Sequence, residues 1–286
     1  MKVQLLPEQN DIGNNRGPAT GMFALQQALR KQASDWFSIS DGPLDGDTIP
    51  WFWETEYGRL ARDCHKLKRP FIVGPNVLFG NSRKPREQEH ERIICDSPYC
   101  LLIITDGIGW YERLIRENLG PESKAEVVAI PYPVTIPQVD HEIRQVNDVL
   151  IYVKSGVNTV IDHRRAFPYN VTIYYGSFER RELLYWAHRS KCCLYLSDDD
   201  RGPIAAAEIL LTGCPLIGIE RGCPWVAMNK PFGMLISDLT VESCKLAVEQ
   251  VSAFNRKTTR FHAEEFFSPN YIAQNMIDVL DKTRGR

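Results

Sequence analysis

The sequence lacks a long uninterrupted hydrophobic run. None of its 286 residues lies in an apolar stretch of the ~18 residues that a membrane-spanning helix needs. The opening stretch MKVQLLPEQND has one lysine and too few apolar residues for a signal peptide. We therefore expect a cytoplasmic protein that makes at most peripheral contact with a membrane.

The sequence also lacks an excess of basic charge and any cluster with the spacing of metal ligands. Its 34 Lys and Arg against 36 Asp and Glu give a net charge of -2, so no nucleic-acid partner is expected. The eight cysteines include no C-x-x-C pair, which predicts small buried thiols rather than a disulfide framework or a zinc site. His163 and His188 belong to no cluster with ligand spacing, so no metal is expected.

Short apolar runs alternate with amphipathic segments along the chain. In the first half this pattern predicts strands at 2–6, 36–39, 70–79, 93–96, 101–106 and 127–130, and helices at 22–32, 51–67 and 109–119. Pro131, Pro133 and Pro137, followed by a charged segment, predict a domain boundary near residue 140.

The second half repeats the alternation. It predicts strands at 148–153 and 171–176, a helix and a strand within 182–197, a helix from Gly202-Pro203 to Gly213, a strand at 215–219 and a helix beginning at Ser268-Pro269. At this length, two α/β domains are expected, each a Rossmann-like parallel sheet covered by helices on both faces.

The stretch Ser197 to Ile219 (SDDDRGPIAAAEILLTGCPLIGI) holds the strongest chemical signal. Asp200 precedes the predicted helix and Glu208 lies inside it, on an otherwise small and apolar segment. A helix N-terminus attracts phosphate, and a carboxylate nearby can accept hydrogen bonds from a ribose diol. The pattern indicates a nucleotide site, with the alternative that Asp200 is only a helix cap and Glu208 a solvated residue.

This stretch resembles the E-x7-E signature of the retaining GT-B glycosyltransferases of family 4. Asp200 stands at the first Glu of that signature and Glu208 at the second, followed by Gly-Cys-Pro and an apolar strand. The resemblance implies two Rossmann-like domains facing a cleft, with an acceptor-side domain at 1–140, a nucleotide-sugar-binding domain at 141–268 and a terminal helix at 269–286 that crosses back. It also implies transfer of a sugar, with retention of configuration, from a nucleotide-sugar donor to a carbohydrate or glycolipid acceptor, without a metal or other cofactor.

The resemblance also assigns roles to single residues. Lys154 would neutralise the leaving diphosphate and Asp200 would face the donor sugar, as the catalytic pair, while Glu208 would bind the ribose. The remaining donor contacts would come from Gly202, Pro203, Ile204, Tyr175, Gly176 and Gly17, and the acceptor contacts from Asn76 and Arg16.

The sequence departs from the family pattern at two places. No His lies between His65 and His90, where many members carry one near the acceptor, and no spaced Arg-Lys pair follows Lys154. These departures keep two alternatives open: a nucleotide-sugar epimerase or hydrolase of the same fold, and a binding protein without turnover.

Overall fold

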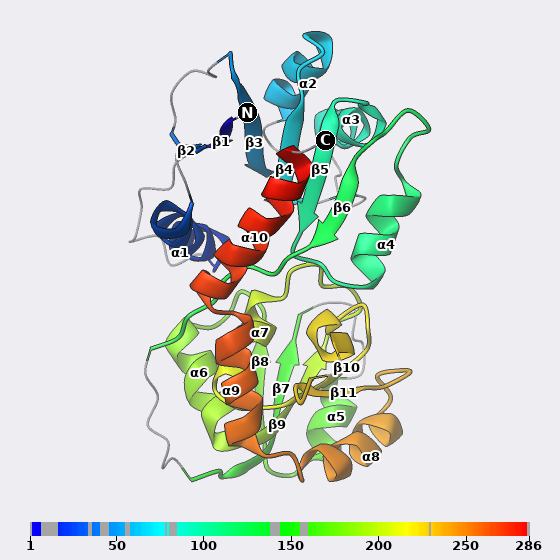
Figure 1. Ribbon diagram of the computed structural model, residues 1–286. Helices are drawn as coiled ribbons and strands as arrows, with labels where there is room; N and C mark the ends of the chain where they lie inside the picture. The colour runs from blue at the N-terminus through cyan, green and yellow to red at the C-terminus, as the bar shows by residue number, and fades with distance from the viewer. Residues whose placement is uncertain are drawn as a thin grey trace. The chain divides into compact units, whose positions relative to one another are not determined.

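The computed structural model (Figure 1) describes residues 2–6, 17–33, 36–40, 46–54, 58–77, 79, 85–137, 144–154, 160–228 and 230–284. The chain forms two compact units. The first comprises Met1–Pro133 together with Pro269–Arg286, and the second comprises Val134–Ser268. The chain leaves the first unit within the proline-rich segment and returns to it with its terminal helix.

The first unit is built on a six-stranded parallel sheet in the order β2-β1-β3-β4-β5-β6. Its strands are β1 (Lys2–Leu6), β2 (Phe37–Ile39), β3 (Thr48–Glu54), β4 (Phe71–Asn76), β5 (Cys100–Thr105) and β6 (Glu126–Ala129). Parallel pairing needs a crossover connection between successive strands, and helices supply most of these crossovers.

Strand β3 corrects the predicted helix at 51–67. The segment forms a strand as far as Glu54, and the helix begins only at Gly58. Trp51 and Trp53 pack on one face of the sheet and Phe52 on the other, so all three side chains are buried. A central parallel strand is apolar on both faces, and its pattern therefore does not alternate.

Helices cover both faces of this sheet. One face packs against α1 (Gly17–Gln32) and α10 (Pro269–Arg284), which lie side by side (Figure 1). The other face packs against α2 (Gly58–Lys66), α3 (Pro85–Asp96) and α4 (Trp110–Glu117). The strand predicted at 93–96 is wrong, because these residues form the last turn of α3, where Ile94 and Cys95 are buried against the sheet.

The second unit is built on a five-stranded parallel sheet in the order β11-β10-β9-β7-β8. Its strands are β7 (Asn147–Val153), β8 (Asn170–Tyr174), β9 (Ser190–Leu196), β10 (Leu216–Gly218) and β11 (Gly233–Leu235). Strand β7 lies between β8 and β9, so it is an internal strand, and its carboxyl end lies beside that of the central strand β9. In open α/β sheets, ligands bind at the carboxyl ends of the strands.

The helices of the second unit also lie on two faces. Helices α5 (Val160–Ala166) and α8 (Val241–Val251) bury one face through the apolar cluster around Val149 and Ile151. Helix α6 (Arg180–Arg189) contacts β7 and β9, α7 (Ile204–Leu211) contacts β10, and α9 (Arg256–Phe266) contacts α7. A short 3-10 helix, η2 (Pro224–Met228), precedes β11.

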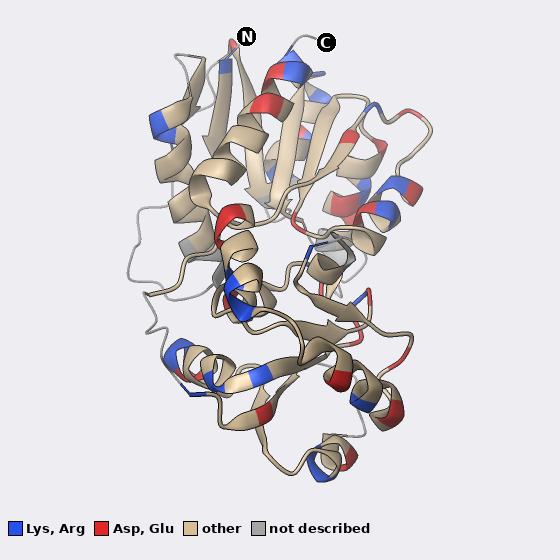
Figure 2. Cartoon of the chain, turned by 60° about the horizontal axis from the view of Figure 1, so that its bottom comes forward, with Lys and Arg blue, Asp and Glu red and all other residues tan. Residues whose placement is uncertain are grey.

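The cysteines and the charged residues are distributed over both units. All eight cysteines are free and buried, as predicted. Basic and acidic residues are interspersed on the helices of both units (Figure 2), in keeping with the small net charge. Among the described helices, none combines the length and the hydropathy needed to cross a membrane.

Candidate functional site

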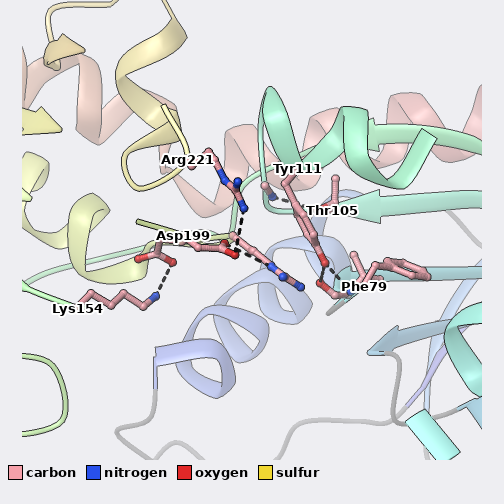
Figure 3. A network of polar contacts seen from close by, with 10 residues as sticks. Phe79, Thr105, Tyr111, Lys154, Asp199 and Arg221 are labelled. Carbon is pink, nitrogen blue, oxygen red and sulfur yellow. Dashed lines mark hydrogen bonds and ion pairs between the residues drawn. The ribbon is translucent and has the colours of Figure 1, made fainter. Parts of the chain in front are cut away.

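An ion pair lies at the carboxyl end of β7. Lys154 directly follows this strand, and its backbone N–H donates to the carbonyl of Leu196 on the neighbouring β9. Its Nζ lies 2.5 Å from Asp200 Oδ1 (Figure 3). The two predicted catalytic residues therefore contact each other.

Asp200 is held on every side. Tyr195 Oη donates to Asp200 Oδ2 at 2.7 Å, the Gly202 amide also donates to this carboxylate, and the side chain is only 1% exposed. Burial raises the pKa of Asp200 above its ordinary value, and the ammonium of Lys154 opposes that rise. This carboxylate has little surface left for a ligand and is well placed to orient Lys154.

A second set of charges surrounds the same loop. Arg221 Nη2 lies 3.7 Å from Asp199 Oδ2 (Figure 3), and Arg201 Nε lies 3.6 Å from Asp199 Oδ1. The Asp200 amide donates to the carbonyl of Arg221 at 2.8 Å, which ties the acidic loop to the segment after β10. Gly222 makes that approach possible, since a Cβ there would lie 2.0 Å from the carbonyl oxygen of Ser197.

Glu208 is the fifth of the eight residues of α7, and its side chain contacts Arg180 at the start of α6. Arg180 Nε lies 2.5 Å from Glu208 Oε1, and Arg180 Nη2 also donates to the carbonyl of Thr135. No group in the described part of the chain hydrogen-bonds Glu208 Oε2. Burial raises the pKa of Glu208, and the Arg180 guanidinium opposes that rise. Glu208 is thus a buried residue with one oxygen bound and one available, not a solvated one.

A stacked aromatic pair lies beside Asp200. The rings of Tyr152 on β7 and Tyr195 on β9 stack, with centroids 4.9 Å apart and an interplanar angle of 19°. The edge of Phe178 closes the other side of the Tyr152 ring at 5.8 Å between centroids. Because the Tyr195 hydroxyl donates to Asp200, the stacked pair lies beside the Lys154–Asp200 ion pair. The negative charges of Asp200 and Glu208 add to burial in raising the pKa of Tyr152.

Sequence reasoning missed three members of this site: Tyr152, Arg180 and Tyr195. Arg180 is 28 residues from its partner Glu208, and its pairing leaves no local pattern. A weak signal existed for the tyrosines. Tyr152 and Lys154 are two residues apart on one strand, and such residues share a face of the sheet.

The amides predicted to contact a diphosphate are partly engaged within the chain. Pro203 has no N–H, the Gly202 amide donates to the Asp200 carboxylate, and the Ile204 amide donates to the Gly202 carbonyl at 2.8 Å. Helix α7 begins at Ile204, one residue after the predicted proline. Attraction of an anion to this loop therefore depends on side-chain cations, among which Lys154 pairs with Asp200.

The predicted nucleobase residues lie at the end of β8. Tyr175 is 62% exposed, and its ring lies 5.4 Å from Lys154 Nζ in a cation–π contact. Gly176 has a φ of +79° and no atom near the position of a Cβ, so the turn is open. A pocket of about 540 Å³ follows, lined by Ser177, Phe178, Glu179, Arg181 and Glu182.

The fold can now be compared with known proteins. No family model matches the sequence, and no curated protein sequence matches it. Sucrose-phosphate synthase from Thermosynechococcus elongatus is similar in structure, with a TM-score of 0.67 at 12% identity over 100% of this chain and 99% of that chain. The Anabaena protein HepE in complex with UDP gives 0.62 at 10% identity over 99% of this chain and 100% of that chain. The apo form of the lipopolysaccharide outer core galactosyltransferase WaaB gives 0.62 at 10% identity over the same shares.

The chain has the GT-B glycosyltransferase fold. The second unit of this GT-B fold holds the Lys154–Asp200 ion pair and, on α7, Glu208 with its partner Arg180. This is the unit in which the sequence places the donor.

Three predicted residues, Arg16, Gly17 and Asn76, belong to the first unit of the chain. Gly17 is the first residue of α1, and Asn76 is the last residue of β4. Tyr111 Oη holds the segment after β4, accepting from the Phe79 amide at 2.6 Å and donating to the Val77 carbonyl at 2.7 Å (Figure 3). Arg16 lies outside the described residues.

Proposed function

We propose that this chain is a glycosyltransferase that takes a nucleotide-sugar donor. The observation that carries the proposal is the placement of Lys154 and Glu208 on a GT-B fold: a cation follows the carboxyl end of β7, and a carboxylate with one oxygen not bound by the described residues lies on α7 of the same unit. A nucleoside diphosphate carries the two groups that these side chains recognise, a diphosphate and a ribose diol. The similar structure of HepE was obtained in complex with UDP and with UDP-glucose.

In this reaction the bond between the anomeric carbon of the sugar and the diphosphate oxygen breaks, and the diphosphate leaves with the electron pair. An acceptor hydroxyl oxygen forms the new bond to the anomeric carbon, and its proton passes to the departing diphosphate oxygen. Negative charge grows on the leaving diphosphate, so a cation beside it stabilises the transition state more than the bound donor. We assign that role to Lys154, and we propose retention of configuration, as in the family that the sequence resembles.

Asp200 acts on this step through Lys154. Sequence reasoning assigns Asp200 to the donor sugar, but both of its oxygens are engaged and its side chain is almost fully buried. We therefore propose that Asp200, held by Tyr195, keeps the Lys154 ammonium in place. A bound diphosphate would then share the ammonium with Asp200, because an ammonium has three protons to donate.

Glu208 is proposed to bind the ribose through Oε2. Arg180 stays paired with Oε1 and holds the Glu208 side chain in its rotamer. Tyr175 and Gly176, with the open pocket after them, are proposed to take the base. Gly17 remains a proposed contact to the donor. A carbohydrate or glycolipid acceptor is proposed to contact Asn76 and Arg16. No metal is proposed, because Lys154 supplies the positive charge.

The experiment is a panel of nucleotide sugars incubated with the full chain, in EDTA, with free nucleoside diphosphate measured. The proposal expects release with at least one donor, faster with an acceptor sugar than with water alone. Release that no acceptor accelerates would instead indicate a hydrolase. A new nucleotide sugar without release would indicate an epimerase, and binding without any reaction would indicate a binding protein.

A further inference from the structure

Tyr152 lies beside the Lys154–Asp200 ion pair of the proposed donor site, although no sequence motif marks it. It is the last but one residue of β7, two residues before Lys154 and on the same face of the strand. Its ring is clamped by the stacked ring of Tyr195 and the edge of Phe178. These two contacts fix the orientation of the Tyr152 ring and therefore the direction of its hydroxyl.

The Tyr152 hydroxyl has no partner in the described part of the chain. The residue is only 1% exposed, and no backbone or side-chain group described by the structure hydrogen-bonds its Oη. The Tyr152 hydroxyl oxygen is not among the fully buried unpartnered atoms of the described residues, so it reaches the surface, where a ligand can accept a hydrogen bond from it. The neighbouring Tyr195 differs, because its hydroxyl donates to Asp200.

A second unpartnered polar atom lies on the same site. Glu208 Oε2 is an acceptor with no hydrogen bond from the described residues, while Tyr152 Oη can donate. Burial and the negative charges of Asp200 and Glu208 raise the pKa of Tyr152 above its ordinary value, so the phenol keeps its proton at neutral pH. Tyr152 Oη is thus a donor and Glu208 Oε2 an acceptor, each without a hydrogen bond from the described residues and neither among their fully buried unpartnered atoms.

We propose that Tyr152 Oη donates a hydrogen bond to a diphosphate oxygen of the bound nucleotide, between Lys154 on the phosphates and Glu208 on the ribose. The choice of atom follows from chemistry: phosphate oxygens only accept, and the phenol supplies a donor beside the ammonium of Lys154. This inference rests on the proposed function and adds to it a residue that binds the donor directly.

The test compares two substitutions that remove one oxygen from two stacked, buried rings. Tyr152→Phe removes a hydroxyl without a protein partner, whereas Tyr195→Phe leaves Asp200 Oδ2 without its donor. The affinity of the full-length variants for UDP, GDP and ADP is measured by calorimetry, and their stability by urea unfolding. A third variant, Tyr185→Phe, changes a half-exposed tyrosine of α6 as a surface control.

For Tyr152→Phe we expect affinity for the bound nucleoside diphosphate to fall about ten-fold, since a hydrogen bond to a charged group is lost. Its urea midpoint should equal or exceed that of the wild type, because no protein group loses a partner. Tyr195→Phe should unfold at lower urea, and Tyr185→Phe should match the wild type in both measurements.

Two results would overturn the inference while leaving the proposed function intact. One is wild-type affinity for the nucleoside diphosphate in Tyr152→Phe. The other is a loss of stability in Tyr152→Phe as large as in Tyr195→Phe, which would reveal a structural partner for the hydroxyl. If the wild type binds none of the three diphosphates, the proposed function fails, and the inference fails with it.

Discussion

Arg180 Nε lies 2.5 Å from Glu208 Oε1, so the first residue of α6 holds a carboxylate on α7. The same guanidinium donates to the carbonyl of Thr135, just after the proline-rich segment begins. Arg180 therefore fixes Glu208 from one side and leaves Oε2 for a ligand. This pairing explains how a carboxylate can be both buried and ready to bind.

Replacing Arg180 should destabilise the protein through Glu208. In Arg180→Ala, a mostly buried carboxylate loses its partner. Because Arg180 is 35% exposed, solvent screening reduces the cost to about 1–2 kcal/mol of unfolding free energy. Urea unfolding measures this change. The matched control is Arg181→Ala, whose pair with Glu179 is 87% exposed on the Arg side and should contribute almost nothing. Equal effects in the two variants would contradict the assignment.

Replacing Lys154 should affect turnover more than donor binding. Lys154→Ala removes the cation whose attraction grows as the diphosphate leaves, so kcat should fall by a larger factor than KM for the donor rises. Steady-state kinetics with the active nucleotide sugar measures both. Lys191→Ala is the matched control, because Lys191 also pairs with an aspartate, Asp148, at the amino end of the same sheet. A kcat for Lys154→Ala within about two-fold of wild type would reject the role.

The raised pKa of Asp200 predicts a definite pH dependence of stability. A carboxyl whose folded pKa lies above its ordinary 3.8 stabilises the fold when protonated and loses that contribution as pH rises through the folded pKa. Asp200→Asn has no such titration. The unfolding free energy of wild type minus that of Asp200→Asn should therefore decrease as pH rises above 3.8. Urea unfolding between pH 4 and 7 tests this, and a difference that grows with pH would show that Lys154 lowers the pKa instead.

Gly222 should tolerate no side chain. The Cβ of an alanine there would lie 2.0 Å from the Ser197 carbonyl oxygen, so the segment after β10 or the end of β9 must shift. We expect Gly222→Ala to cost about 1–3 kcal/mol of stability, the usual range for overpacking. Thermal unfolding measures the loss. Gly46→Ala, where no atom lies near the added Cβ, should leave the melting temperature unchanged; a similar drop in both would attribute the effect to glycine replacement alone.

The sequence predicted the fold class because most strands carry a local signal. Strand β1 was predicted with its observed bounds, and the helix–strand succession of the second unit follows from apolar runs and proline or glycine breaks. The errors at 51–67 and 93–96 share a cause. Buried strands and buried helix ends both appear as short apolar runs, and periodicity does not separate them.

The residues of the candidate site also differ in whether the local sequence predicts them. The local sequence indicates where strands end and the next helix follows, and ligands bind at the carboxyl ends of parallel strands. This signal was enough to single out Lys154, Asp200 and Glu208. Arg180 is recognisable only in three dimensions. Even the role of Asp200 depends on burial, because the sequence shows an acid at the right spacing but not that its oxygens are already bound.

The most direct test of the account is calorimetric titration of the full chain with UDP, GDP and ADP, for wild type and for Glu208→Ala. The account predicts saturable one-to-one binding of at least one of them. It also predicts that Glu208→Ala weakens that binding about ten-fold or more, since a charged acceptor for the ribose is worth roughly 1.5–3 kcal/mol. Binding that is equally tight without Glu208, or no binding of any diphosphate by the wild type, would contradict it.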